Sequence, residues 1–258
     1  MAQIEEVEGI ILYYRKHRER DFLVKMMTKK YGKIMFFVRG TKKQGGRPSP
    51  EIQPFSRALY IADIREEGLS FLRGAKEIET SRDLQTDIFR NAYATYICGL
   101  IDAAIEDHLP NIPLYNLLEQ SLHLLNEGYA PEVISNIMET KLLVVFGVAP
   151  NFQSCAICQK TQGAFDYSDK FHGILCSDHF FEDARRLHID PKAVHLVRLY
   201  SVIQLEKVGD ISLKVSTQHE IKRLLDHIYE QSVGLSLKSK KFIDNLYKWE
   251  DTLKKEID

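Results

Sequence analysis

Cysteine and histidine residues in the middle of the chain have the spacing of a metal site. Cys155 and Cys158 form a C-x2-C pair, and Cys176 and His179 repeat that internal spacing seventeen residues later. A turn of this kind lets two thiolates face one ion, and three thiolates with one imidazole are the ligands of tetrahedral zinc. The pattern predicts a zinc ion bound by Cys155, Cys158, Cys176 and His179.

The fourth ligand is the least constrained by spacing, because Asp178, His172 or a water molecule could take the place of His179. A catalytic zinc keeps an open position and needs a nearby general acid or base. Three thiolates and one imidazole would close the coordination sphere. We therefore expect the zinc to be structural. Cysteines grouped in this way, without a secretion signal, also favour a reducing compartment.

Basic residues gather near the start of the chain. Residues 15–47 contain twelve Lys and Arg against two Asp and Glu, although the whole chain has a net charge of −1. Aromatic residues lie among them, and cations beside rings are what binding of a single strand requires. We expect the following residues to contact nucleic acid: Arg15, Lys16, Arg18, Lys25, Lys33, Arg39, Lys42, Lys43 and Arg47.

A plainer interpretation of the same segment stays open. Strands bury alternate residues, so for any one of Phe22, Phe36 and Phe37 a core position is favoured, and the lysines would then lie on a solvated face.

Short strands must position these cations. Five runs rich in aliphatic and aromatic residues fill the first 80 residues, at 9–14, 22–28, 33–38, 55–64 and 69–75. Gly32 provides a hairpin between the second and third runs. Five short strands in about 75 residues fit a small closed barrel, and the OB-fold is the commonest five-stranded one. Residues 1–80 are therefore predicted to be an OB-fold nucleic-acid-binding domain.

The hydrophobic period changes from two to 3.6 after Thr80, which with Asp83 could form a capping box for a helix reaching Ile105. Further helices are expected to begin near Pro113, Pro131 and Pro191, at Thr217, and near residue 240. The predicted class is α+β: the OB barrel, then an α-helical domain of residues 81–149 and 181–258, with a zinc-finger-like insert at 150–180.

Composition excludes several other classes. With 44% hydrophobic and 28% charged residues the chain is ordinary globular material. It has no apolar run of the roughly 18 residues that a membrane helix needs, and its acidic start does not have the character of a signal peptide, so we expect a cytoplasmic protein. The phosphate-binding, zinc-protease and nucleophile-elbow motifs are missing, which favours a binding protein over an enzyme.

Several segments, in this order, resemble a known family. They are residues 8–12 (EGIIL), 19–22 (ERDF), 28–33 (TKKYGK), 38–40 (VRG), 53–55 (QPF) and 237–242 (LKSKKF). The first five are similar to the N-terminal OB domain of the RecO family of bacterial recombination mediator and repair proteins. The sixth looks like that family's basic segment near the C-terminus. The resemblance extends over essentially the whole chain.

The resemblance implies a non-enzymatic mediator of the RecF-type repair pathway. Such a protein would bind single- and double-stranded DNA, promote annealing, bind the C-terminal tail of single-strand binding protein, and act with RecR to load RecA. It would be cytoplasmic and associated with the nucleoid during repair. It also implies zinc on Cys155, Cys158 and Cys176, with His179 where many members have a fourth cysteine.

Three other functions stay open from the sequence: an RNA-binding OB protein of translation or RNA processing, a zinc-dependent hydrolase of nucleic acid, and a scaffold without DNA affinity. The pocket for the partner's tail cannot be matched to particular residues. An electropositive rim for it could be formed by Lys222, Arg223, Lys238, Lys240 and Lys241.

Overall fold

The computed structural model describes residues 3–40, 47–65 and 68–257, with side chains from Ile4 to Trp249 inside those ranges. The chain divides into two compact units, Met1–Gly128 together with Leu237–Asp258, and Tyr129–Ser236. Among the described helices none has the length and apolar composition required to cross a membrane. The domain limits expected from the sequence, at 80, 149 and 181, stay predictions.

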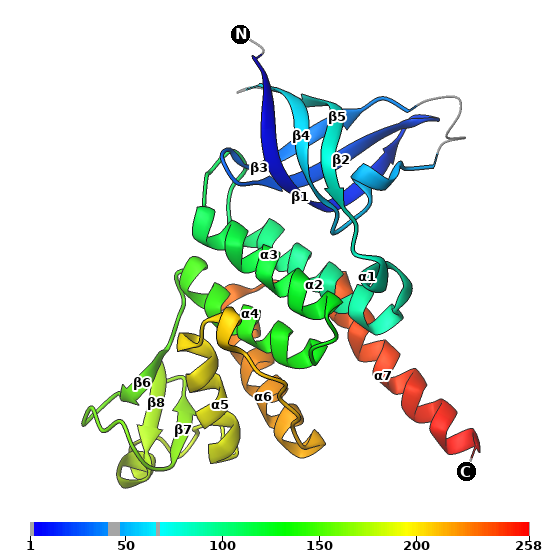
Figure 1. The fold of residues 1–258 in the computed structure, drawn as a ribbon. Helices are drawn as coiled ribbons and strands as arrows, with labels where there is room; N and C mark the ends of the chain where they lie inside the picture. The colour runs from blue at the N-terminus through cyan, green and yellow to red at the C-terminus, as the bar shows by residue number, and fades with distance from the viewer. Residues whose placement is uncertain (1–2, 41–46, 66–67, 258) are drawn as a thin grey trace. The chain divides into compact units, whose positions relative to one another are not determined.

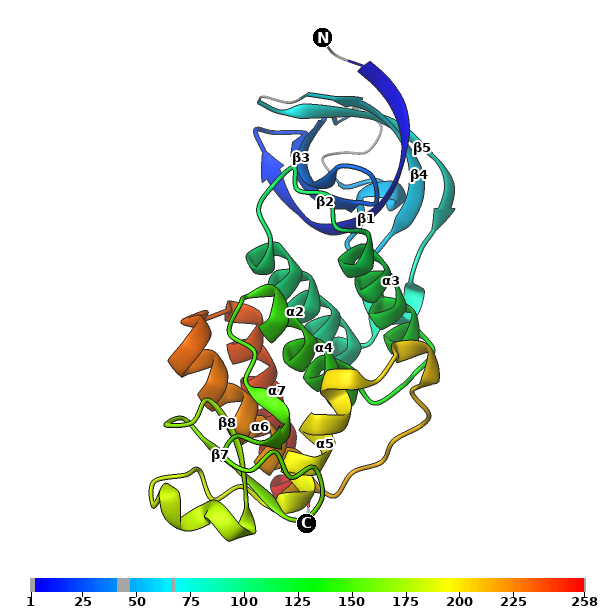
Figure 2. The ribbon, with the colours of Figure 1, turned by 90° about the vertical axis from the view of Figure 1, so that its left-hand side faces the viewer.

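Five strands form a closed barrel in the first unit. They are β1 (Gln3–His17), β2 (Asp21–Thr28), β3 (Gly32–Val38), β4 (Arg57–Ile64) and β5 (Ser70–Glu79). Their order around the barrel is β1-β2-β3-β5-β4, and β1 closes it by pairing with β4 (Figure 2). All pairs are antiparallel except β3 with β5. This arrangement confirms the predicted OB-fold.

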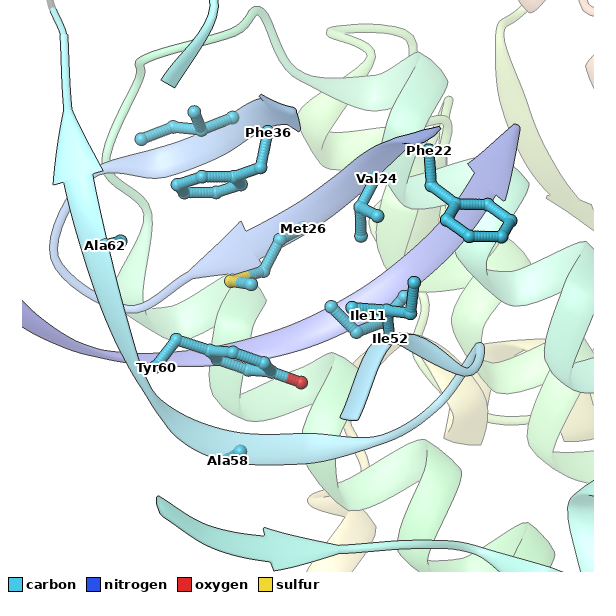
Figure 3. Packing of buried hydrophobic residues seen from close by; sticks show 10 residues of the cluster. Ile11, Phe22, Val24, Met26, Phe36, Ile52, Ala58, Tyr60 and Ala62 are labelled. Carbon is cyan, nitrogen blue, oxygen red and sulfur yellow. The ribbon is translucent and has the colours of Figure 1, made fainter. Parts of the chain in front are cut away.

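Alternate residues of the strands fill the barrel. Phe22, Met26, Phe36 and Tyr60 are 2% exposed or less, and their side chains point into a common interior (Figure 3). The Tyr60 hydroxyl donates a hydrogen bond to a carbonyl of the short 3-10 helix η2 (Pro50–Ile52), which packs into the same core. Phe22 and Phe36 are therefore core residues, whereas Phe37 stays partly exposed on the outer face.

Four helices belong to the same unit: α1 (Arg82–Thr86), α2 (Ile88–Ala104), α3 (Ile112–Asn126) and α7 (Lys238–Ile257). The capping box predicted at Thr80 and Asp83 does not form, because Ser81 occupies the N-cap of α1 without a side-chain hydrogen bond. Asp87 instead ends α1 and caps α2, accepting a hydrogen bond from the Arg90 N–H at 2.9 Å. The single helix expected here is consequently two.

The segment that follows α2 lies against the β2–β3 hairpin. His108 N–H donates to the carbonyl of Lys33 at 2.9 Å, and the backbone of Leu109 lies over Gly32. Gly32 has a φ of +69°, and a Cβ there would lie 2.2 Å from the Leu109 carbonyl oxygen. Only glycine meets both demands, so the hairpin turn also makes room for the helical segment.

The second unit combines helices with a small sheet. Its elements are α4 (Pro131–Val145), β6 (Asn151–Cys155), β7 (Phe165–Ser168), β8 (Gly173–Cys176), η3 (Ser177–Glu182), α5 (Pro191–Val202), η4 (Leu205–Lys207), α6 (Val215–Ile228) and the π-helical turn η5 (Tyr229–Val233). The sheet has the order β6-β8-β7, and α5 packs against it and against α4 (Figure 1). Within this unit α6 begins at Val215, two residues before the predicted cap, and Thr217 lies inside its first turn.

Candidate metal centre and nucleic-acid surface

The four predicted zinc ligands come from adjoining elements of the second unit. Cys155 ends β6, Cys158 follows in the turn, Cys176 ends β8, and His179 lies in η3. β6 and β8 pair in parallel, which brings the two strand ends to one edge of the sheet. The four ligand atoms lie within 4.8 Å of one another. The structure thus brings together all four residues that the spacing selected.

Distances between these atoms fit a tetrahedral ion. Zn–S bonds of about 2.3 Å and Zn–N bonds of about 2.0–2.1 Å place two sulfurs about 3.8 Å apart, and a sulfur about 3.6 Å from a nitrogen. Cys158 Sγ lies 3.7 Å from Cys176 Sγ. His179 Nδ1 lies 3.3 Å from Cys176 Sγ and 3.8 Å from Cys155 Sγ. The donor set is compatible with zinc.

Other candidates for the fourth ligand are placed elsewhere. His172 lies in the turn between β7 and β8, at the end of β8 away from Cys176. The carboxylate of Asp178 pairs with the Lys160 ammonium at 2.9 Å, which lowers the pKa of Asp178. His179 is therefore the residue whose ring completes the group of ligand atoms.

Local backbone prepares the first thiol for a metal. Burial by itself would raise the pKa of Cys155, but N–H groups of Cys158, Cys176 and Ile157 donate to its sulfur and lower that pKa to about 6. Such N–H groups stabilise a thiolate, the form that binds zinc. The pKa of Cys176 is raised, mainly by burial. The two thiols are thus unequal before any metal binds.

Several cations of the basic segment are already paired. Lys25 and Lys33 have side chains only 6% and 4% exposed. The Lys25 ammonium lies 2.5 Å from the Asp107 carboxylate, and that of Lys33 lies 2.9 Å from Asp102 and 3.5 Å from Asp107. These carboxylates come from the end of α2 and the segment after it. Both lysines hold the helices to the barrel, and their charges are neutralised there.

Two more lysines of the segment, Lys29 and Lys30, pair with carboxylates of β1. Six other cations are exposed and, within the residues that the structure describes, have no carboxylate within 4.0 Å: Arg15, Lys16, Arg18, Arg20, Arg39 and Arg47. We call these six the basic rim. Lys42 and Lys43 lie outside the described residues.

Five residues of the basic rim lie where β1 ends, β2 begins and β3 ends, and the sixth, Arg47, lies shortly before η2. Gly40 fastens this region, because its N–H donates to the Asp21 carboxylate at 3.2 Å and a Cβ on it would lie 1.8 Å from the Arg20 carbonyl oxygen. Arg39 is thereby held beside the β1–β2 turn. It also lines a hollow of about 180 Å³ together with Ser49 and Arg73.

Two arginines of this region were missed by the sequence reasoning. Arg65 follows β4 and Arg73 lies in β5, and both guanidinium groups approach the carboxylate of the buried Asp63. They lie outside the window of residues 15–47 in which the charge was counted. Arg65 directly follows one predicted strand and Arg73 lies within the next, on either side of Gly68, and this placement was the signal that could have found them.

The C-terminal basic residues fall in different units. Lys222 and Arg223 belong to α6 and form ion pairs with Asp226 and Glu220. Lys238, Lys240 and Lys241 begin α7. A common surface for a partner's tail therefore stays a prediction.

Comparison with known proteins gives two family models that together match most of the chain. Residues 1–81 match the model described as Recombination protein O N terminal, and residues 85–241 match Recombination protein O C terminal. Similar relatives named DNA repair protein RecO occur in Enterococcus faecalis (48% identical over 249 residues, 96% of this chain and 95% of the relative), Levilactobacillus brevis (40% over 255, 99% and 98%) and Latilactobacillus sakei (43% over 251, 97% and 92%).

Proposed function

This chain belongs to the RecO family of DNA repair proteins, and on that premise we propose that it is a DNA-binding recombination mediator without catalytic activity of its own. In this role it binds single- and double-stranded DNA, anneals complementary strands, and helps to replace single-strand binding protein with RecA together with RecR. We place it in the cytoplasm, at the nucleoid during repair.

The observation that carries the DNA-binding part of this proposal is the basic rim. Its six cations are exposed, five of them lie at one end of an OB barrel, and among the described residues no carboxylate lies within 4.0 Å of any of them, in a chain whose net charge is −1. Phosphates bound there would release counterions, which makes binding favourable and dependent on salt. Lys42 and Lys43 stay in the proposed surface on the strength of the sequence. Lys25 and Lys33 do not, because Asp102 and Asp107 already occupy their ammonium groups.

Zinc has a structural role in this proposal. Cys155, Cys158, Cys176 and His179 would hold it, and with four protein ligands no position is left for a reacting water. It would join β6, β8 and η3 at one point. The tail of single-strand binding protein and RecR are the protein partners we propose.

Binding of DNA to the basic rim is tested by the salt dependence of affinity. Each phosphate contact contributes about 0.7 to the slope of log affinity against log salt for a single strand. Arg39→Gln with Arg47→Gln should therefore lower the slope by about 1.4 and weaken binding at low salt. Lys76→Gln is the matched control, because Lys76 is exposed but paired with Glu6 at 2.5 Å. An unchanged slope in the double variant would remove the rim from the DNA-binding surface.

Mediator function is tested with complementary strands coated by single-strand binding protein. The wild-type chain should accelerate their annealing, and the double variant should do so less. No acceleration by the wild type would contradict the mediator role. Competition between DNA and RNA single strands of equal length addresses the RNA-binding alternative, since an RNA reader uses the 2′-hydroxyl and would prefer RNA.

A further inference from the structure

Three aromatic rings form a row on the outer face of the barrel. Phe36 lies in the core, so Phe37 points outward, and β3–β5 pairing places it in register with Phe71. The Phe37 and Phe71 ring centroids lie 5.7 Å apart at 61°. His17, at the end of β1, places its ring 6.1 Å from that of Phe37 at 82°. All three side chains are partly exposed. We call them the aromatic row.

Two guanidinium groups flank one end of the aromatic row. Arg65 Cζ lies 4.5 Å from the centroid of the Phe71 ring, and Arg73 Cζ lies 5.6 Å from it. The side chains of these arginines are 44% and 55% exposed. Asp63, 4% exposed, anchors both from below, with its Oδ2 3.2 Å from Arg73 and 3.9 Å from Arg65. One carboxylate faces two cations, so a positive charge is left beside the ring.

The row lies at the end of β3 that the helices leave uncovered. The helical segment meets the start of β3, where Lys33 is paired and Gly32 lies under Leu109. Phe37 lies near the other end of β3, two residues before Arg39 of the basic rim. Arg73 lines the same 180 Å³ hollow as Arg39. Aromatic surface and unpaired positive charge are therefore neighbours.

We propose that His17, Phe37 and Phe71 form a stacking surface for the bases of single-stranded DNA, with Arg65 and Arg73 extending it. This inference rests on the proposed DNA binding and adds which residues meet the bases. Unpaired bases stack on aromatic rings without regard to sequence, and arginine planes stack in the same way. Bases in a duplex are already stacked on each other. The row would thus favour single strands, whereas the basic rim binds the phosphates of either form.

The test measures binding of Phe71→Leu to three probes of equal length: an oligothymidylate, an abasic strand with the same phosphates, and a duplex. Leucine keeps the apolar contact but removes the flat ring. Loss of one base-stacking site corresponds to about a 5- to 150-fold loss of affinity. We expect at least a fivefold loss for oligothymidylate, no change for the abasic strand or duplex, and an unchanged salt slope. Phe71→Tyr should retain wild-type affinity because it retains the ring.

Phe171→Leu is the matched control, since Phe171 is another partly exposed phenylalanine with a cation, Lys170, 4.9 Å from its ring centroid. It should bind all three probes as the wild type does. If Phe71→Leu binds oligothymidylate as tightly as the wild type, or loses affinity equally for all probes while Phe71→Tyr does not restore it, the stacking surface is refuted and the proposed DNA binding stands. If the wild type binds none of the probes, the proposed function itself fails.

Discussion

Replacing Asp107 by asparagine should destabilise the barrel far more than replacing an exposed glutamate. Asp107 is the carboxylate 2.5 Å from Lys25, and it also lies 3.5 Å from Lys33. A neutral amide in place of this carboxylate would leave the ammonium of Lys25 buried without an opposite charge. The resulting cost is the desolvation of a cation, which is large wherever water cannot reach it.

The size of the effect follows from exposure. Removing one partner of a buried ion pair costs about 3–5 kcal/mol. The Asp107 side chain is 47% exposed, so solvent screens part of its interaction, and Lys33 keeps Asp102. We therefore expect Asp107→Asn to lower the free energy of unfolding of this unit by about 2 kcal/mol, below that range. Glu6→Gln breaks the exposed pair with Lys76 and should cost at most about 1 kcal/mol.

Urea unfolding followed by circular dichroism measures the loss, and hydrogen exchange of the β2 and β3 amides locates it in this unit. The double variant Lys25→Met with Asp107→Asn should recover part of the stability, because it removes the buried charge instead of isolating it. The reasoning is refuted if Asp107→Asn costs no more than Glu6→Gln, or if the double variant is as unstable as Asp107→Asn alone.

Three further predictions concern other parts of the molecule. Purified protein should contain one zinc per chain by elemental analysis. Cys176→Ser or a chelator should remove this zinc and speed hydrogen exchange in β6–β8, without changing the salt slope of DNA binding. Slow exchange after complete loss of the metal would contradict a structural zinc. Burial opposes ionisation of Asp107, but the hydrogen bond and charge of Lys25 prevail and lower its pKa, so its stabilisation is complete above about pH 4 and is lost as pH falls through the lowered value. Urea midpoints between about pH 7 and pH 2.5 should fall less steeply in Asp107→Asn than in the wild type, and parallel curves would contradict this sign. Gly40→Ala should lower the free energy of unfolding by about 1–3 kcal/mol and weaken DNA binding, because the added Cβ would lie 1.8 Å from the Arg20 carbonyl oxygen. Gly209→Ala is the control, because no atom lies within 4 Å of the added carbon. Equal melting temperatures of the two variants would refute the close contact.

Local patterns in the sequence were enough to predict the barrel and the grouping of the three cysteines with His179. Period-two burial and a glycine hairpin specify strands by themselves, and the paired spacing of Cys155, Cys158, Cys176 and His179 allows only a narrow set of geometries. The helix after residue 80 was less determined. Thr80 and Asp87 both carry side chains able to cap a helix, and the sequence alone does not determine which of them does so.

The sequence could not predict which cations form ion pairs, because their partners are remote in the sequence. Lys25 and Asp107 are 82 residues apart, and Lys33 and Asp102 are 69 apart. A charge count over residues 15–47 includes both lysines yet excludes both aspartates. Arg65 and Arg73 were missed because they lie outside this window in the sequence. The strand pairing that places Phe71 beside Phe37 brings them near the rim.

Paired and unpaired cations divide the barrel into two ends of different charge. Lys33 at the start of β3 meets Asp102, and Arg57 at the start of β4 meets Glu119 of α3 at 2.7 Å. Charges in water are screened within about 8 Å at physiological ionic strength, so each end presents its own field to a ligand and the net charge of the chain matters little. The carboxylates of α2, of the segment after it and of α3 therefore do more than attach helices to strands. By neutralising one end of the barrel they leave the other as the positively charged end, so in the proposed DNA binding the path of the DNA would be set in part by residues that need not touch it.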